Sequence, residues 1–260
     1  MAKEFIAIDV ETTGLDPREH KICEFGAVKF NDAGEILDKL DLLVDPGRMI
    51  PFPALKIHGI KNEMVEGAPT PKEGWTKLLE WCGDTSVLVA HNASFESYFI
   101  QALYDDNEVK PELSIIDTLK IAKRQFKNES SYKLSDLIPS LGSKAHRALP
   151  DAEACVELFL QLSETYKSGK IPDSNAKDIW AFDYIEENKP SYKQLNYIET
   201  LGGDSDQPKT KAEASEYIDE LKDLQGQQSK KQVDDSSGGS GLVMFIAIIS
   251  TIFVVAYFVA

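Results

Sequence analysis

Short runs rich in apolar residues, bounded by charged or turn residues as is typical of β-strands, occur in the first 44 positions of the chain. Residues 4–10 (EFIAIDV), 24–30 (EFGAVKF) and 35–44 (EILDKLDLLV) all read in this way, and NDAG, a turn sequence, separates the last two. The pattern predicts three strands, of which the second and third form a hairpin.

Helical spacing of apolar residues begins at Pro71 and then alternates with short strands. The helical stripes are Trp75 to Cys82, 95–104 and Ala152 to Leu162, the last entered through Pro150, a residue favoured in a first helical turn. SVLVAH at 86–91 reads as a short buried strand between the first two helices. We therefore expect an α/β fold in which helices flank a mixed sheet.

The pattern divides the chain into an N-terminal domain, residues 1–168, and a series of smaller segments. Residues 169–190 lack periodicity and predict a linker. Residues 191–224 predict a small module of two helices, because Gly202 suits a helix C-terminus and Thr210 with Glu213 forms a capping-box pattern. Residues 225–241 are polar and rich in Gly and Ser, which favours a flexible tether.

Residues 242–260 (LVMFIAIISTIFVVAYFVA) are apolar except for Ser250 and Thr251. At about 1.5 Å per helical residue, such a run is long enough to cross the hydrocarbon core of a bilayer. It predicts a single-pass C-terminal transmembrane helix that anchors the protein to a membrane. The N-terminus has no secretory signal pattern, so we expect the N-terminal domain in the cytoplasm.

The chain is acidic, with 43 Asp and Glu against 28 Lys and Arg, which excludes a surface generally suited to polyanions. Between Lys120 and Arg147, however, seven basic residues face two acidic ones, a local net charge of +5. This stretch is a candidate phosphate track with Tyr132 as a stacking surface, or else a solvated helix face. The spacing of the cysteines and histidines does not fit a zinc site, and no GxSxG motif is present.

Acidic residues occur where elements of the predicted sheet begin or end. Asp9 and Glu11 are two apart in a strand, so their side chains point to the same side, and hard cations such as Mg²⁺ or Mn²⁺ suit such a pair. Glu96 opens one helix, and Asp151 opens another, five residues after His146. Each alone could be a solvated charge or a complement to a helix dipole. Together they predict one acidic edge of the sheet.

Three segments resemble the exonuclease motifs of the DEDDh (DnaQ-like) 3′–5′ exonucleases, a family that includes the proofreading epsilon subunit of bacterial DNA polymerase III. These segments are FIAIDVETTGLDP, HNASFESYF and HRALPDAEAC, and IHGI at 57–60 and IDTLKIAK at 116–123 resemble intervening segments. The resemblance covers roughly residues 3–165. It implies a ribonuclease H-like fold and hydrolysis of DNA or RNA from the 3′ end to nucleoside 5′-monophosphates.

The resemblance also implies the roles of individual residues. Two divalent cations, Mg²⁺ or Mn²⁺, would be held by the carboxylates of Asp9, Glu11, Glu96 and Asp151, with Asp9 bridging both. His146 would be the general base, since an imidazole can take a proton near neutral pH. The pocket for the terminal nucleotide at the 3′ end would be formed by Thr12, Thr13, Gly14, Leu15, His58 and Phe95.

Glu96 departs from the family pattern, which usually has Asp at this position. Its carboxylate reaches one methylene further, on the order of 1.5 Å, and catalytic geometry is sensitive to about 1 Å. A contact to metal through water could absorb this length by losing the water. The alternative is therefore an inactive relative of the same fold, which binds nucleic acid as a membrane-tethered adaptor.

Overall fold

The computed structural model describes residues 3–105, 107–165, 169, 171, 175–182 and 188–236. The chain forms two compact units, one up to Glu187 and the other from Asn188 onward. We treat each unit by itself.

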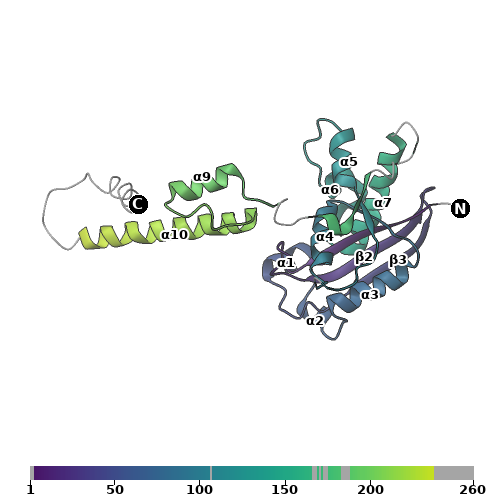
Figure 1. The fold of residues 1–260 in the computed structure, drawn as a ribbon, viewed down its shortest axis with the longest axis horizontal. Helices are drawn as coiled ribbons and strands as arrows, with labels where there is room; N and C mark the ends of the chain where they lie inside the picture. The colour runs from purple at the N-terminus through teal and green to yellow at the C-terminus, as the bar shows by residue number, and fades with distance from the viewer. Residues whose placement is uncertain are drawn as a thin grey trace. The chain divides into compact units, whose positions relative to one another are not determined.

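The first unit is built on a mixed sheet with the strand order β3-β2-β1-β4-β5-β6 (Figure 1). β1 pairs antiparallel with β2 and parallel with β4, so the three-stranded start joins an α/β sheet as predicted. β5 adds in parallel to β4, and β6 closes the sheet in the antiparallel sense. The strands are β1 (Glu4–Thr12), β2 (Ile22–Asn31), β3 (Ile36–Leu43), β4 (Val87–Ala90), β5 (Ser114–Asp117) and β6 (Ala176–Asp178).

Helices cover both faces of this sheet (Figure 1). They are α1 (Phe52–His58), α2 (Asn62–Val65), α3 (Pro71–Cys82), α4 (Ala93–Gln101), α5 (Thr118–Gln125), α6 (Leu134–Leu137) and α7 (Ala148–Thr165), with 3₁₀ turns η1 (Pro139–Lys144) and η3 (Ile179–Ala181). α3 and α4 pack on one face through side chains such as Trp75 and Phe99. α5 and α7 pack on the other face, where Phe159 contacts the rings of Phe5 and Phe30.

The alternation along β1 assigns its side chains to these two faces. Ile6, Ile8 and Val10 belong to the core under α3 and α4. Phe5 and Ala7 belong to the core under α7. Because side chains two apart share a face, Asp9 and Glu11 continue the row of Phe5 and Ala7 on the α7 side of the sheet.

The predicted linker at 169–190 differs from the structure. β6 and η3 lie in this range and belong to the first unit, because β6 pairs with β5 and the side chains of Ile179 and Phe182 enter the core. The side-chain amide of Gln101 in α4 also donates hydrogen bonds to the carbonyls of these two residues, at 2.7 and 3.3 Å. The sequence of this segment resembles a linker because β6 is an edge strand of only three residues, held to β5 by backbone hydrogen bonds.

The second unit contains two helices, α9 (Tyr192–Thr200) and α10 (Lys211–Ser236), packed through Ile198, Ala214 and Ile218. α10 continues through 225–236, where we expected the tether to begin. Gln and Lys are good helix formers, so a polar composition does not stop a helix that has already started.

The predicted transmembrane helix at 242–260 and the last part of the predicted tether lie outside the described residues. Within the described part of the chain, no helix is long and apolar enough to cross a membrane. The anchor and its cytoplasmic orientation therefore stay predictions.

Candidate active site

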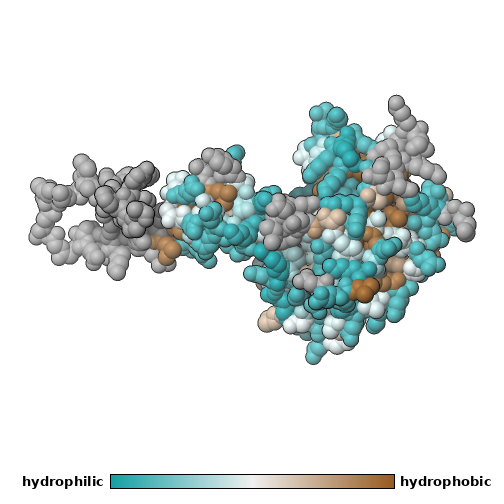
Figure 2. All heavy atoms as spheres, in the orientation of Figure 1, coloured by the Kyte–Doolittle hydropathy of each residue, from teal (hydrophilic) through white to brown (hydrophobic). Residues whose placement is uncertain are grey.

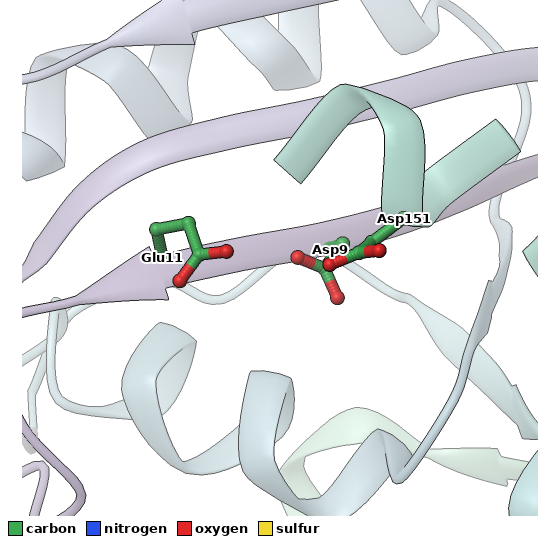
Figure 3. Close-up of side chains that lie close together, drawn as sticks. All are labelled: Asp9, Glu11 and Asp151. Atoms are coloured by element: carbon green, nitrogen blue, oxygen red, sulfur yellow. The ribbon is translucent and has the colours of Figure 1, made fainter. Parts of the chain in front are cut away.

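Asp9, Glu11 and Asp151 come together at the end of β1 (Figure 3). Each offers a carboxylate oxygen, and the three oxygens lie within 4.8 Å of one another. Asp9 and Glu11 project from the same strand, and Asp151 reaches toward Asp9 from the first turn of α7 (Figure 3). The two segments, about 140 positions apart in sequence, thus form one acidic group of the kind that holds a divalent cation.

His146 lies in the loop that leads into α7, and its side chain is exposed. Its backbone adopts a left-handed conformation, with φ of 68°, which is uncommon for a residue other than glycine. In this conformation the N–H of His146 donates a hydrogen bond to Oδ2 of Asp151 at 2.9 Å. The backbone of the predicted general base is therefore tied to a predicted metal ligand.

Glu96 occupies the first turn of α4, but its carboxylate is not one of the three oxygens grouped within 4.8 Å. The side chain is only 3% exposed, and its Oε2 has no hydrogen-bond partner in the described part of the chain. Oδ2 of the buried Asp117 at the end of β5 also lacks a hydrogen bond there, although Nζ of Lys120 lies 3.6 Å away. A buried, unbonded carboxylate oxygen is costly unless a proton or a cation reaches it.

Burial and mutual repulsion raise the pKa values of the acidic residues in the site. Burial raises the pKa of Asp9 well above its usual range, and the nearby carboxylates, Glu96 first, raise it further. Burial, together with Asp151 and Glu24, raises the pKa of Glu11 to about 8, although Arg147 opposes this. The pKa values of Glu96 and Asp151 are raised as well, chiefly by burial. A bound divalent cation would reverse this effect by favouring the charged carboxylates, so the residues present fit a metal site.

The predicted nucleotide-pocket residues near the end of β1 have different surroundings. Thr12 and Thr13 are buried, and their hydroxyls bond within the chain: Thr12 donates to the carbonyl of Gly14 at 2.6 Å, and Thr13 contacts Nδ1 of His20 at 3.2 Å. A Cβ at Gly14 would overlap the ring of His20, so glycine is required there. Leu15, in contrast, is 78% exposed. The first unit is mainly hydrophilic on the face drawn in Figure 2.

The other two pocket residues are more enclosed than we expected. His58, at the end of α1, is buried, and its Nδ1 accepts a hydrogen bond from the N–H of Ile60 at 3.0 Å. Phe95 is partly buried in α4, where its ring lies 4.9 Å from that of Phe99. Their contact with a nucleotide remains a prediction.

Some basic side chains of the candidate phosphate track already contact other residues of the protein. The Arg147 guanidinium donates to Glu24, and Arg124 donates to Asn175 at 2.8 Å. Lys120 lies over the ring of Phe182 as well as near Asp117. The sequence predicts the net charge of this stretch but not these internal partners.

Glu24 and Asp117 are the two buried acids near the site to which we assigned no role from sequence. The signal for Glu24 is an acid next to the apolar start of β2, in ICEFGAV at 22–28. The signal for Asp117 is its place in IDTLKIAK, where it caps α5 by accepting a hydrogen bond from the N–H of Lys120 at 3.2 Å.

The fold and the acidic group are together those of a ribonuclease H-like nuclease domain, with carboxylates suited to a divalent cation. The family model described as Exonuclease (RNase_T) matches residues 6–159, and the chain belongs to this family. The resemblance of the three motifs to DEDDh exonucleases agrees with this assignment.

Among curated proteins, the chain is similar to DNA polymerase III PolC-type of Clostridium perfringens. The two are 37% identical over 159 residues, which make up 60% of this chain and 11% of that polymerase. It is also similar to the PolC-type polymerase of Listeria welshimeri, with 34% identity over 194 residues, or 73% of this chain and 13% of that one. The chain therefore spans about a tenth of the length of these relatives.

Among solved structures, exonuclease X in complex with 5′ overhanging duplex DNA is 28% identical and has a TM-score of 0.50. The alignment covers 65% of this chain and 98% of exonuclease X. The nuclease domain of 3′hExo, a DEDDh family member bound to rAMP, shares the fold, with a TM-score of 0.53 at 22% identity and coverage of 63% and 92%.

Proposed function

We propose that this protein is a metal-dependent 3′–5′ exonuclease that removes nucleoside 5′-monophosphates from the 3′ ends of DNA or RNA. The observation that carries the proposal is the convergence of Asp9, Glu11 and Asp151 beside the loop of His146. Membership of the exonuclease family supports it, and so does the buried Oε2 of Glu96, which has no hydrogen-bond partner among the described residues.

The chain's own residues fit two tasks of phosphodiester hydrolysis. Asp9, Glu11 and Asp151 would hold the metal, with Glu96 acting at longer range or through water. Two divalent cations, Mg²⁺ or Mn²⁺, would supply neutralisation of the charge that develops on the attacking and leaving oxygens.

His146 is the proposed general base. Its exposed imidazole would take a proton from the attacking water as that oxygen bonds to phosphorus. The bond from phosphorus to the 3′ oxygen of the preceding nucleotide then breaks, and this oxygen is protonated from solvent. The hydrogen bond from the His146 backbone to Asp151 keeps the base beside the metal-holding carboxylates.

The terminal nucleotide would lie against the loop that follows β1. Leu15 offers an exposed apolar side chain there, next to the Gly14 carbonyl that Thr12 holds in place. We propose that this loop contacts the last base and sugar, and that the exposed side chains of Lys123, Lys127 and Lys133 provide any more distant phosphate contacts.

The full chain should be incubated with 5′-labelled single-stranded DNA, duplex DNA and RNA, in Mg²⁺, Mn²⁺ or EDTA. We expect a ladder of shortened products that depends on metal and is absent from Asp9→Ala. Glu80→Ala removes an exposed carboxylate from α3, away from the acidic group, and is the matched control that should behave as wild type.

The adaptor alternative makes a different prediction in the same assay. An adaptor would bind the labelled strands tightly without shortening them in either metal, and Asp9→Ala would leave the products unchanged. That result would overturn the exonuclease proposal.

A further inference from the structure

Glu24 lies in β2, between β1 and β3 in the sheet. The residue is fully buried, with an exposed fraction of 0%. Nε of Arg147 donates to both of its oxygens, at 3.0 and 3.1 Å, and Nη2 donates to Oε1. The N–H of Ala148, the first residue of α7, donates to Oε2 at 2.9 Å. One buried acid therefore holds both the loop before α7 and the start of that helix.

The strand register places this contact beside the candidate metal ligands. Glu24 is the cross-strand partner of Glu11, and Gly26 is the partner of Asp9. Residues directly opposite in antiparallel strands share a face, so Glu24 and Gly26 lie on the α7 side next to the two carboxylates.

Gly26 provides a second contact between β2 and the start of α7. A Cβ at this position would overlap the backbone of Ala148 and Leu149, so the helix start rests directly on the strand. β2 thus contacts the α7 start at two adjacent points, each opposite one of the β1 carboxylates.

We propose that Glu24 and Arg147 are positioning residues, which fix the start of α7, with His146 and Asp151, at the distance from Asp9 and Glu11 that catalysis requires. This inference rests on the proposed function, since it concerns the geometry of that site. Neither side chain needs to contact the nucleic acid or the metal for this role.

The chemistry of the pair suits positioning. A guanidinium bound to a carboxylate through two nitrogens fixes direction as well as distance, which a lysine cannot do. The hydrogen bonds that Arg147 donates to Glu24 raise the pKa of Arg147, and the carboxylates of Asp41 and Glu11 add to this, so the guanidinium stays charged. A buried ion pair of this kind is weak evidence for stability but strongly restrains geometry.

The competing interpretation of Arg147 is a phosphate contact, as its place in the basic stretch suggests. In the structure its Nε and Nη2 both point to Glu24, while 36% of its side chain remains exposed. The two interpretations differ in kinetics. Loss of a phosphate contact would raise KM, whereas misplacement of His146 and Asp151 would lower kcat.

The test uses the full chain with Glu24→Gln, Arg147→Met, Arg147→Lys and the double variant Glu24→Gln/Arg147→Met. The control is Lys39→Met. This variant breaks an exposed ion pair, 2.5 Å long, between Lys39 in β3 and Glu153 in α7. Two quantities are measured: kcat and KM on 5′-labelled single-stranded DNA in saturating Mn²⁺, and hydrogen exchange of the Ala148 to Asp151 amides without metal.

We expect kcat to fall by about 10- to 100-fold in Glu24→Gln and in Arg147→Met, while KM stays within about threefold. The double variant should be little worse than either single one, because the pair acts as a unit. The amide of Ala148 should exchange at least about tenfold faster, while β1 amides and the Lys39→Met enzyme keep wild-type values. Arg147→Lys preserves the charge, so it should fold and still lose kcat.

Wild-type kcat in Arg147→Lys and Glu24→Gln, or a rise in KM alone, would overturn the positioning role, and the rise would favour a phosphate contact. Unchanged exchange at Ala148 would overturn it as well. If the wild-type chain cleaves no nucleic acid, the proposed function fails, and the exchange measurement still decides whether this pair holds the start of α7.

Discussion

The backbone N–H of His146 donates a hydrogen bond to Oδ2 of Asp151 across one tight loop, at 2.9 Å. The proposed general base and a proposed metal ligand are thereby connected within six consecutive positions of the chain. The left-handed backbone at His146 costs on the order of 1 kcal/mol for a residue with a Cβ, and this bond helps to offset that cost.

Substitution of His146 should separate chemistry from folding. Asn tolerates the left-handed region but has no basic nitrogen, so His146→Asn should keep the melting temperature of wild type and lose about 10²- to 10⁴-fold in kcat. Single-turnover cleavage of labelled DNA and thermal unfolding measure these two effects. An unchanged kcat would remove His146 from the mechanism.

Glu96 tests whether charge or length matters at the buried acid. Glu96→Asp should keep or raise kcat, while Glu96→Gln should lower it by about tenfold or more, because the amide keeps the size but cannot supply a negative charge. The rise in melting temperature caused by Mn²⁺, measured in the same variants, should shrink only in Glu96→Gln. Equal turnover of wild type and Glu96→Gln would contradict a role in holding metal.

The raised pKa of Glu11 predicts how pH affects the metal-free protein. An acid whose pKa rises from 4.5 to about 8 on folding stabilises the fold below pH 4.5, and this contribution is lost as the pH rises through 8. The melting temperature in EDTA should therefore fall between pH 5 and 8.5, and less so in Glu11→Gln. Mg²⁺ binds the deprotonated form, so its stabilising effect should grow over the same range.

His91 should contribute in the opposite direction at acid pH. Burial lowers its pKa, although a hydrogen bond between Nε2 and the Tyr132 carbonyl, at 2.8 Å, acts against this. A histidine whose folded pKa is depressed stabilises the fold above pH 6.5, and this contribution is lost as the pH falls below that value. Urea unfolding of wild type and His91→Asn from pH 7 to 5 should give a steeper loss in wild type, and parallel slopes would contradict the prediction.

The boundary of the first unit can be tested by truncation. A chain that ends at 187 should unfold in one cooperative transition, whereas one that ends at 168 loses the buried side chains of Ile179 and Phe182. Burial of two such side chains contributes about 3 kcal/mol or more, so the shorter chain should melt well below the longer one. Equal melting temperatures would restore the linker interpretation of 169–190.

The sequence predicts those parts of the molecule in which a local period is sustained. Strands β1 and β2 are long runs rich in apolar residues, and the spacing of two between Asp9 and Glu11 in β1 places both side chains on one side of the sheet. β6 has three residues and no apolar row, so nothing local distinguishes it from a loop. The sequence pattern does not predict the extension of α10 to Ser236 for a similar reason, because a run of polar helix formers has no amphipathic stripe.

The sequence does not predict the pairing of Glu24 with Arg147, and the reason is different. Arg147 is 123 positions away, and its neighbours in sequence are basic, so composition assigns it to a phosphate surface. Only the packing of α7 against β2 shows that the charge is directed inward. Long-range pairs of this kind depend on tertiary structure, which no local pattern records.

The division of the acidic group between β1 and α7 also has a consequence for synthesis of the chain. Asp9 and Glu11 leave the ribosome early, but Asp151 and the helix that carries it emerge only after most of the first unit has been made. Until α7 packs on the sheet, the nascent chain has half of a cation site and no base beside it. Under the proposed function, nuclease activity would therefore be absent while the polypeptide is still next to messenger RNA, and would begin only in the finished fold.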